Sequence, residues 1–159
     1  MPIVLLRVDE RLIHGQVVVG WGGPLHADRI VIADDEIAGS PWEQELYCLG
    51  MPPEMEASFE TLDDARARLP DWRAGGARVI VLVRDAAGLL RLSERGALDG
   101  EEVNLGGVHD AEGRTRVLPY LHLSDADRDA LRRVGEAGAR VTARDLPASR
   151  AVPLEELLG

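Results

Sequence analysis

The stretch RVIVLVRDAAGLLRLSERG, residues 78–96, decides the fold that the sequence predicts. Residues 78–85 are apolar on both faces of an extended chain and rich in β-branched side chains, which is typical of a strand buried inside a parallel sheet. Residues 86–96 follow with a helical pattern that ends at a glycine. A buried strand followed directly by a helix is the repeating unit of an α/β fold.

The same alternation extends along the chain in both directions from this unit. Ser40, Thr61 and Ser124 each precede a helical pattern and are expected to cap it, with an acidic residue three positions later. Further strands are predicted at residues 3–8, 29–34, 55–60, 101–107 and 139–147, and further helices at 40–50, 61–69, 124–138 and 153–159. We therefore expect an open, mostly parallel twisted sheet with helices on both faces, in a single domain spanning residues 1–159.

Two segments allow more than one interpretation. Residues 15–26 contain three valines and several glycines, which are poor helix formers, so the pattern alone permits a strand. Their position between two strands that should be parallel predicts a crossover helix instead. Residues 116–123 resemble a strand, and Pro119 indicates that this strand lies at a sheet edge or begins after the proline.

The composition excludes several classes of function. The 159 residues carry a net charge of −10, which opposes binding to nucleic acids and to anionic membrane surfaces. All 18 basic residues are arginine, so neither a P-loop lysine nor a Schiff-base lysine is available. Without an apolar membrane span, a signal peptide or a second cysteine beside Cys48, we expect a cytoplasmic protein with reduced thiols.

Ligands of open parallel sheets bind beyond the carboxyl ends of the strands, and the loop at residues 9–14 is the richest candidate there. His14 precedes the expected helix, and the start of a helix favours phosphate. Arg11 offers a planar guanidinium to phosphoryl oxygens, and Asp9 could orient that guanidinium or the imidazole. A neutral histidine in this setting can attack phosphorus.

The other candidate sites are weaker. Asp34, Asp35 and Glu36 could bind Mg²⁺, but acidic residues before a helix more often cap it, and no metal site is predicted. His26, His109 and His122 do not cluster in sequence, which argues against a zinc site. His109 and Arg84 could each border the active face or simply be solvated. The glycines of GWGGP do not form a dinucleotide fingerprint, and no cofactor is expected.

The segment RVDERLIHGQV, residues 7–17, closely resembles the opening of the IIB component of the mannose/fructose/sorbose family of sugar phosphotransferase systems. That family carries an R-x-D-x-R-L-x-H-G-Q-V segment, and every fixed position is matched here. The resemblance continues in order through RIVIADDEIAGSPWEQELYCLGMPP, VIVLVRDAAGLLRLSERG and EVNLGGVHDAEGRTRV, so that it covers nearly the whole chain. The first motif is highly specific, and the later ones add collinearity.

The resemblance implies a role for each residue of the motif. His14 would accept a phosphoryl group from a phosphohistidine on a IIA partner and pass it to a sugar held by membrane IIC and IID partners. Arg11 would be the main contact to the phosphoryl oxygens, with Asp9 as its ion-pair partner. Arg7, Gly15 and Gln16 would be further contacts, and neither a metal nor a cofactor is required. The His14 loop would then be exposed and surrounded by a docking face.

Two rival interpretations use the same chain. It could be a regulatory phospho-switch that accepts a phosphoryl group on His14 without supplying a sugar permease, or an α/β domain that binds a small molecule without phosphotransfer. The resemblance also implies a location at the inner face of the membrane, reached through the partners. The sequence leaves open which sugar is taken up and whether the chain forms a homodimer.

Overall fold

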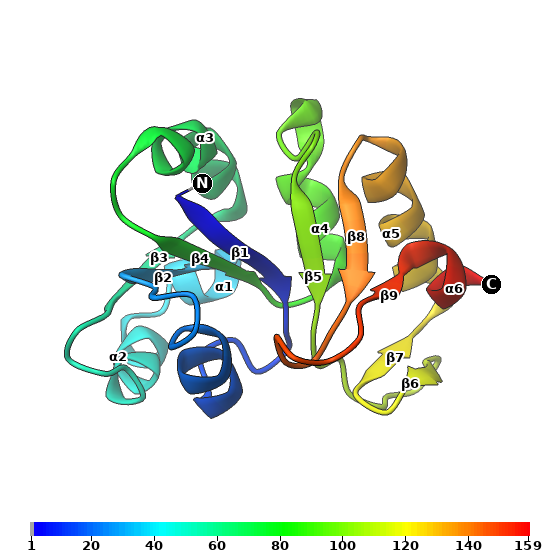
Figure 1. The fold of residues 1–159 in the computed structure, drawn as a ribbon, viewed down its shortest axis with the longest axis horizontal. Helices are drawn as coiled ribbons and strands as arrows, with labels where there is room; N and C mark the ends of the chain where they lie inside the picture. Colours follow the sequence, from blue (N-terminus) through cyan, green and yellow to red (C-terminus); the bar gives the residue numbers. More distant parts are fainter. Residues whose placement is uncertain (1) are drawn as a thin grey trace.

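A seven-stranded sheet runs through the middle of the protein in the order β3-β2-β4-β1-β5-β8-β9 (Figure 1). The computed structural model describes residues 2–159. The strands are β1 Ile3–Val8, β2 Arg29–Ala33, β3 Glu56–Glu60, β4 Val79–Val83, β5 Glu102–Leu105, β8 Arg140–Ala143 and β9 Val152–Pro153. All neighbours are parallel except β8 and β9, which are antiparallel. The predicted open, mostly parallel sheet is confirmed.

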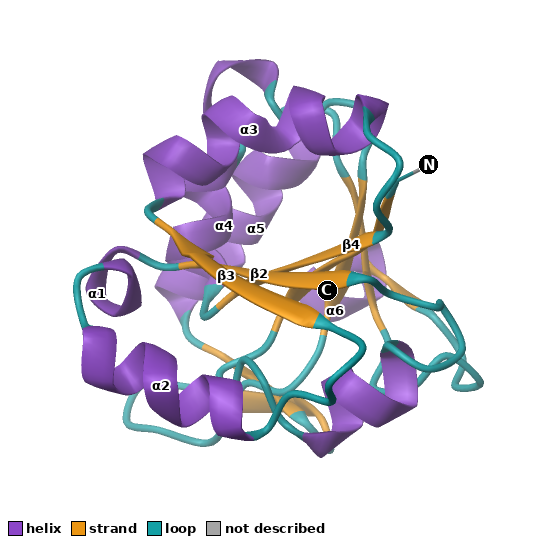
Figure 2. Ribbon diagram, turned by 90° about the vertical axis from the view of Figure 1, so that its left-hand side faces the viewer, coloured by secondary structure: helices purple, strands orange, loops and turns teal. Residues whose placement is uncertain are grey.

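Helices cover both faces of this sheet (Figure 2). One layer contains α3 Leu62–Ala74, α4 Ala86–Leu92, α5 Asp125–Glu136 and α6 Leu154–Leu158, and the other contains η1 Gln16–Trp21, α1 Asp35–Ala38 and α2 Pro41–Leu49. A short turn of helix, η2 Glu94–Gly96, follows α4. A hydrophobic core lies between the sheet and each helix layer, and strand β4 contributes side chains to both. Val79, Val81 and Val83 face the first layer, whereas Ile80 and Leu82 face the second. No helix among residues 2–159 has the length and apolar character needed to cross a membrane.

The segment after the first loop is a crossover helix, as its position predicts, but it is wider than an α-helix. The Gly22 amide donates to the Val17 carbonyl at 2.8 Å, a spacing of five residues. A Cβ at Gly22 would collide with the Val18 carbonyl. The glycine-rich sequence therefore permits this wide turn, which joins β1 to the helix layer beneath it.

Residues 116–123 do not form a single strand, but a strand does begin after Pro119, as one of the two predicted alternatives has it. The segment forms an antiparallel hairpin of β6 Thr115–Leu118 and β7 Leu121–Leu123, which turns at Pro119 and Tyr120. Proline has no amide hydrogen to donate to a strand partner, so the chain reverses at this point. Helix α3 also differs from the prediction, since it continues through Pro70 to Ala74.

The pairing between β1 and β5 is much shorter than the pairing between β1 and β4. Strands β1 and β4 pair from Ile3 to Val8, whereas β1 and β5 pair only at Arg7 with Asn104 and at Val8 with Leu105. The two strands diverge toward their amino ends (Figure 1). The halves β3-β2-β4-β1 and β5-β8-β9 are therefore joined mainly at the carboxyl edge of the sheet.

Candidate active site

The loop that follows β1 is held between the neighbouring strands. The Asp9 amide donates to the Val83 carbonyl at the end of β4, and the Glu10 amide donates to the Gly107 carbonyl after β5, both at 2.9 Å. Leu12 is buried and has a φ of 56°, in the left-handed region that side chains rarely adopt. Its burial anchors the turn in the core, so that the next residues return across the sheet edge toward η1.

Asp9 lies at the centre of the site and is fully buried. Its carboxylate accepts hydrogen bonds from the Arg7 guanidinium and from the Arg11 amide, and Oδ2 lies 3.1 Å from His14 Nε2. Burial favours the neutral acid, but the contact with His14 and the charge of Arg7 outweigh it, so the pKa of Asp9 lies below its ordinary value. Asp9 is therefore a buried carboxylate that contacts both the guanidinium and the imidazole.

Arg7 is also fully buried and uses every nitrogen of its guanidinium. Besides Asp9, it donates to the side chains of Asn104 on β5 and Gln16 on η1, and to the carbonyls of Arg144 and Asp145 beyond β8. Its guanidinium carbon lies 5.2 Å from the centroid of the Trp21 ring. Burial lowers the pKa of Arg7, and the Asp9 carboxylate opposes that shift. Arg7 thus bridges the two halves of the sheet beneath the loop, with no donor left for a ligand.

His14 has one closed side and one open side. Its side chain is 15% exposed. Nε2 is buried beside Asp9 without hydrogen-bond geometry, and it has no other partner in the described part of the chain. The exposed part of the ring therefore belongs to atoms other than Nε2. The His14 carbonyl accepts from the amides of Val17 and Val18, which begins η1 and fixes the backbone that carries the ring.

Arg11 differs from Arg7 in its surroundings. Its side chain is 48% exposed, and its only ion-pair contact within residues 2–159 is a distant one of 4.0 Å from Nε to Asp9 Oδ1. The amides of Gly15 and Gln16, beside His14, have no hydrogen-bond partner among the described residues. The loop that carries His14 thus presents a partly free guanidinium and two free amides, a combination that suits phosphoryl oxygens.

A second cluster supports the same loop, and sequence reasoning found only part of it. The Glu10 carboxylate accepts from the His109 amide at 2.9 Å, lies 3.0 Å from His109 Nδ1, and accepts from Arg114. This contact raises the pKa of Arg114. Glu10 therefore ties the loop to the segment after β5. The sequence offered no signal for this pairing, because Glu10 and Arg114 are 104 residues apart.

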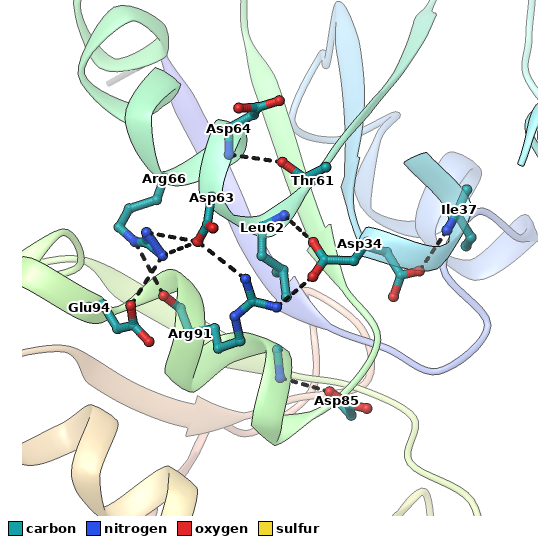
Figure 3. A network of polar contacts seen from close by, with 12 residues as sticks. Asp34, Ile37, Thr61, Leu62, Asp63, Asp64, Arg66, Asp85, Arg91 and Glu94 are labelled. Carbon is teal, nitrogen blue, oxygen red and sulfur yellow. Dashed lines mark hydrogen bonds and ion pairs between the residues drawn. The ribbon is translucent and has the colours of Figure 1, made fainter. Parts of the chain in front are cut away.

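The acidic residues at 34–36 are engaged in structural contacts. Asp34 accepts from the Ile37 amide and caps α1, and it also pairs with Arg84 at 3.2 Å. Asp35 accepts from the Leu62 amide and from Arg91, which in turn reaches Asp63 in the network that joins α1, α3 and α4 (Figure 3). Within residues 2–159, no group of three or more His, Cys, Asp or Glu side chains could hold a metal ion.

Comparison with known proteins shows the family to which the chain belongs. Residues 3–159 match the family described as the PTS (phosphotransferase system) sorbose subfamily IIB component. The chain is 33% identical over 160 residues to the N-acetylgalactosamine-specific phosphotransferase enzyme IIB component 2 of Escherichia coli, covering 99% of this chain and 100% of that one. It is 27% identical to the mannose-specific EIIAB component of the same species, covering 99% of this chain but 49% of that one.

The fold leads to the same family. The IIB domain of the sorbose permease from Klebsiella pneumoniae superposes with a TM-score of 0.86 at 26% identity, covering 99% of this chain and 96% of that one. The resemblance found in the sequence is confirmed over nearly the whole length. This chain belongs to the sorbose subfamily of phosphotransferase-system IIB components, a family of transferases that take part in phosphoryl transfer during sugar uptake.

Proposed function

We propose that the chain is a phosphocarrier, which accepts a phosphoryl group on His14 from the phosphohistidine of a IIA partner and passes it to a sugar held by membrane IIC and IID partners. It would act at the cytoplasmic face of the membrane, reached through those partners. The observation that carries the proposal is the one-sided burial of His14, whose Nε2 is closed off beside Asp9 while the rest of the ring keeps an opening. The mannose-specific relative is named EIIAB, which supports a IIA partner.

We assign Nδ1 of His14 as the atom that accepts the phosphoryl group. The negative charge of the Asp9 carboxylate, 3.1 Å from Nε2, favours the tautomer that carries its proton there, which leaves the lone pair on Nδ1 unprotonated. That lone pair would attack phosphorus in line as the bond from phosphorus to the partner's nitrogen breaks. In the second step, a sugar hydroxyl oxygen would attack the same phosphorus and the bond to Nδ1 would break, with loss of the hydroxyl proton.

The remaining residues have separate roles in this proposal. Arg11 would contact the phosphoryl oxygens, together with the free amides of Gly15 and Gln16. Asp9 would orient His14 and hold the loop. Arg7 would be a positioning residue and not a phosphoryl contact, because its guanidinium is fully engaged by acceptors of the protein. Phosphoryl transfer depends mostly on positioning and on stabilisation of charge, so this small group of residues is sufficient.

The test is transfer of labelled phosphate from a phosphorylated IIA protein, followed by mapping of the labelled residue. We expect acid-labile phosphate on His14, none in His14→Ala, and full labelling in His109→Ala, the matched control for the second histidine near the loop. Label on any other residue of the wild-type protein would refute the proposal. Adding membranes that contain IIC and IID, with sugar, then separates a carrier, which loses its label, from a regulatory phospho-switch, which retains it.

A further inference from the structure

Helix α2 has an apolar stripe that faces solvent and does not pack against the core. Trp42, Leu46 and Leu49 follow the spacing i, i+4, i+7 and are 65%, 56% and 83% exposed. No residue of α2 is fully buried. Helices of globular proteins normally turn such a stripe toward the core, and large exposed apolar side chains that share one face mark interaction sites. We call these three side chains the α2 stripe.

The α2 stripe continues into the loop that carries His14. A groove of about 340 Å³ lies beside it, lined by Ile13 and by residues of α2 that include Trp42, Leu46 and Tyr47. Ile13 immediately precedes His14 in the chain, and its side chain reaches the end of α2 near Gly50. Figures 1 and 2 agree in placing α2 and the first helix η1 on the same side of the sheet. A protein that covers His14 from this side would also cover the groove and the stripe.

We propose that the α2 stripe and its groove dock the phosphorylated IIA partner; this inference rests on the proposed function. Asp9 closes one side of the His14 ring, so the incoming phosphohistidine must approach over the open side, and its protein must seat on the surface around it. Trp42 would be the central anchor, since exposed tryptophans beside a pocket are frequent hot spots of binding.

Charge favours this occupant over three others. The exposed Arg11 guanidinium complements a phosphoryl group that arrives already attached to its carrier, whereas an incoming sugar is neutral. Glu43 and Glu45 on α2, with the net charge of −10, oppose an anionic lipid surface. A second copy of this chain seated on the groove would obstruct access to His14, and it would bring an equally acidic surface.

Transfer kinetics test the docking surface. For Trp42→Ala and Leu46→Ala, we expect the KM for phosphorylated IIA to rise at least about tenfold with kcat unchanged, and Trp42→Phe to restore most of the loss. Both side chains are exposed, so thermal unfolding should be unchanged. Arg132→Ala on α5, in the opposite helix layer, is the control and should keep the wild-type KM. Unchanged KM values in the α2 variants, with His14 still labelled, would overturn the docking surface while leaving the proposed function intact.

A binding measurement tests the docking surface without relying on phosphoryl transfer. Of the three tryptophans, Trp21 and Trp72 are buried, so Trp42 is the one that a partner can touch directly. With 5-fluorotryptophan in this chain, we expect unlabelled IIA to shift the ¹⁹F resonance that Trp42→Phe removes, and to leave that of Trp72 in place. An unmoved Trp42 resonance would overturn the proposal. So would α2 variants whose defect is confined to sugar phosphorylation by IIC/IID membranes, because the stripe would then bind those partners. A wild-type dimer that Trp42→Ala dissociates would overturn it as well. Absence of labelling on wild-type His14 would instead refute the proposed function.

Discussion

At the scale of single residues, burial separates arginines that the sequence treats alike. Arg7 and Arg11 both belong to the motif around His14, yet one is fully buried and bonded to protein acceptors while the other is half exposed. A buried guanidinium satisfied by carboxylate, amide and carbonyl oxygens can hold a loop in shape. A partly free guanidinium can bind an anion. The roles of the two residues therefore follow from their surroundings.

Replacing Asp9 by asparagine should strongly destabilise the protein. The change leaves Arg7 buried without its counter-charge, and breaking such a pair typically costs about 3–5 kcal/mol. Urea unfolding at pH 7 measures the loss. Asp129→Asn is the control, because that carboxylate is exposed on α5, and it should cost less than about 1 kcal/mol.

The effect of Asp9 should also depend on pH in a defined direction. Its pKa is lower in the folded protein than in the unfolded chain, so its stabilisation is complete above about pH 4, the ordinary range of an aspartate. It is lost as the pH falls through the lower folded value. The stability difference between the wild type and Asp9→Asn should thus be constant near neutral pH and shrink below about pH 4. A difference that grows with acidity would contradict this assignment.

Arg11→Ala should mainly reduce the rate of phosphoryl transfer, whereas Arg7→Met should mainly reduce the stability of the fold. Removing Arg11 should slow phosphoryl transfer about 10²- to 10³-fold, the usual effect of losing one charge-stabilising donor, with a change in stability below about 1 kcal/mol. Arg7→Met should lower stability, because it strands the buried carboxylate of Asp9. Single-turnover transfer and urea unfolding of both variants give the comparison. A stable Arg7→Met protein or a fast Arg11→Ala protein would reverse the roles proposed here.

The motif residues could be named from sequence, but their separate surroundings could not. Asp9, Arg11 and His14 stand within six positions of one another, and a strand end places them together at a sheet edge. The acceptors of Arg7 include Asn104 and a carbonyl at Asp145, which only the folded sheet brings near. No local pattern shows that a guanidinium will be fully engaged by such distant groups.

At the scale of elements, the predicted strands and most of the helices are present, because apolar periodicity and capping residues act locally. Side-chain capping was less predictable. Ser124 accepts from the Asp127 amide and completes a capping box, whereas Ser40 precedes α2 without a side-chain hydrogen bond. The two sequences are similar, so this difference arises from the backbone that precedes each helix: Ser124 has ψ 172° and Ser40 has ψ 87°.

The two serines provide a matched test of capping. Ser124→Ala should destabilise the protein by about 1 kcal/mol, because the Asp127 amide loses its acceptor. Ser40→Ala should change stability by less than about 0.5 kcal/mol, since no hydrogen bond is removed. Thermal or urea unfolding measures both changes. Equal losses at the two positions would mean that Ser40 caps α2 in solution.

Two other elements depended on the backbone chemistry of a single residue and not on apolar pattern. The wide helix η1 is possible because glycine occupies position 22, where a side chain would meet the preceding turn. The hairpin reverses at Pro119 because proline has no amide hydrogen to donate to a strand partner. By apolar pattern, each segment could have formed one strand. Residues 16–21 form a helix instead, and the strand at residues 116–123 is interrupted at Pro119.

At the scale of the whole molecule, the sheet should open in two stages. Strand β4 is buried along its length and paired on both sides, whereas β5 is paired with β1 at only two positions. Native-state hydrogen exchange should therefore show the amides of β2 and β4 protected nearly to the free energy of global unfolding, and those of β5 and β8 protected less. Uniform protection across all of these strands would contradict the division.

The short junction between β1 and β5 has a geometric consequence for His14. The two halves of the sheet form a wedge whose apex is the Arg7 bridge, and the loop lies directly upon that apex. If the two halves of the sheet rotate about this junction, the displacement is greatest at the amino ends of β1 and β5 and smallest at Arg7. We therefore expect the His14 imidazole to keep its position, and its alignment with an incoming phosphoryl donor, when the amino ends of β1 and β5 move apart.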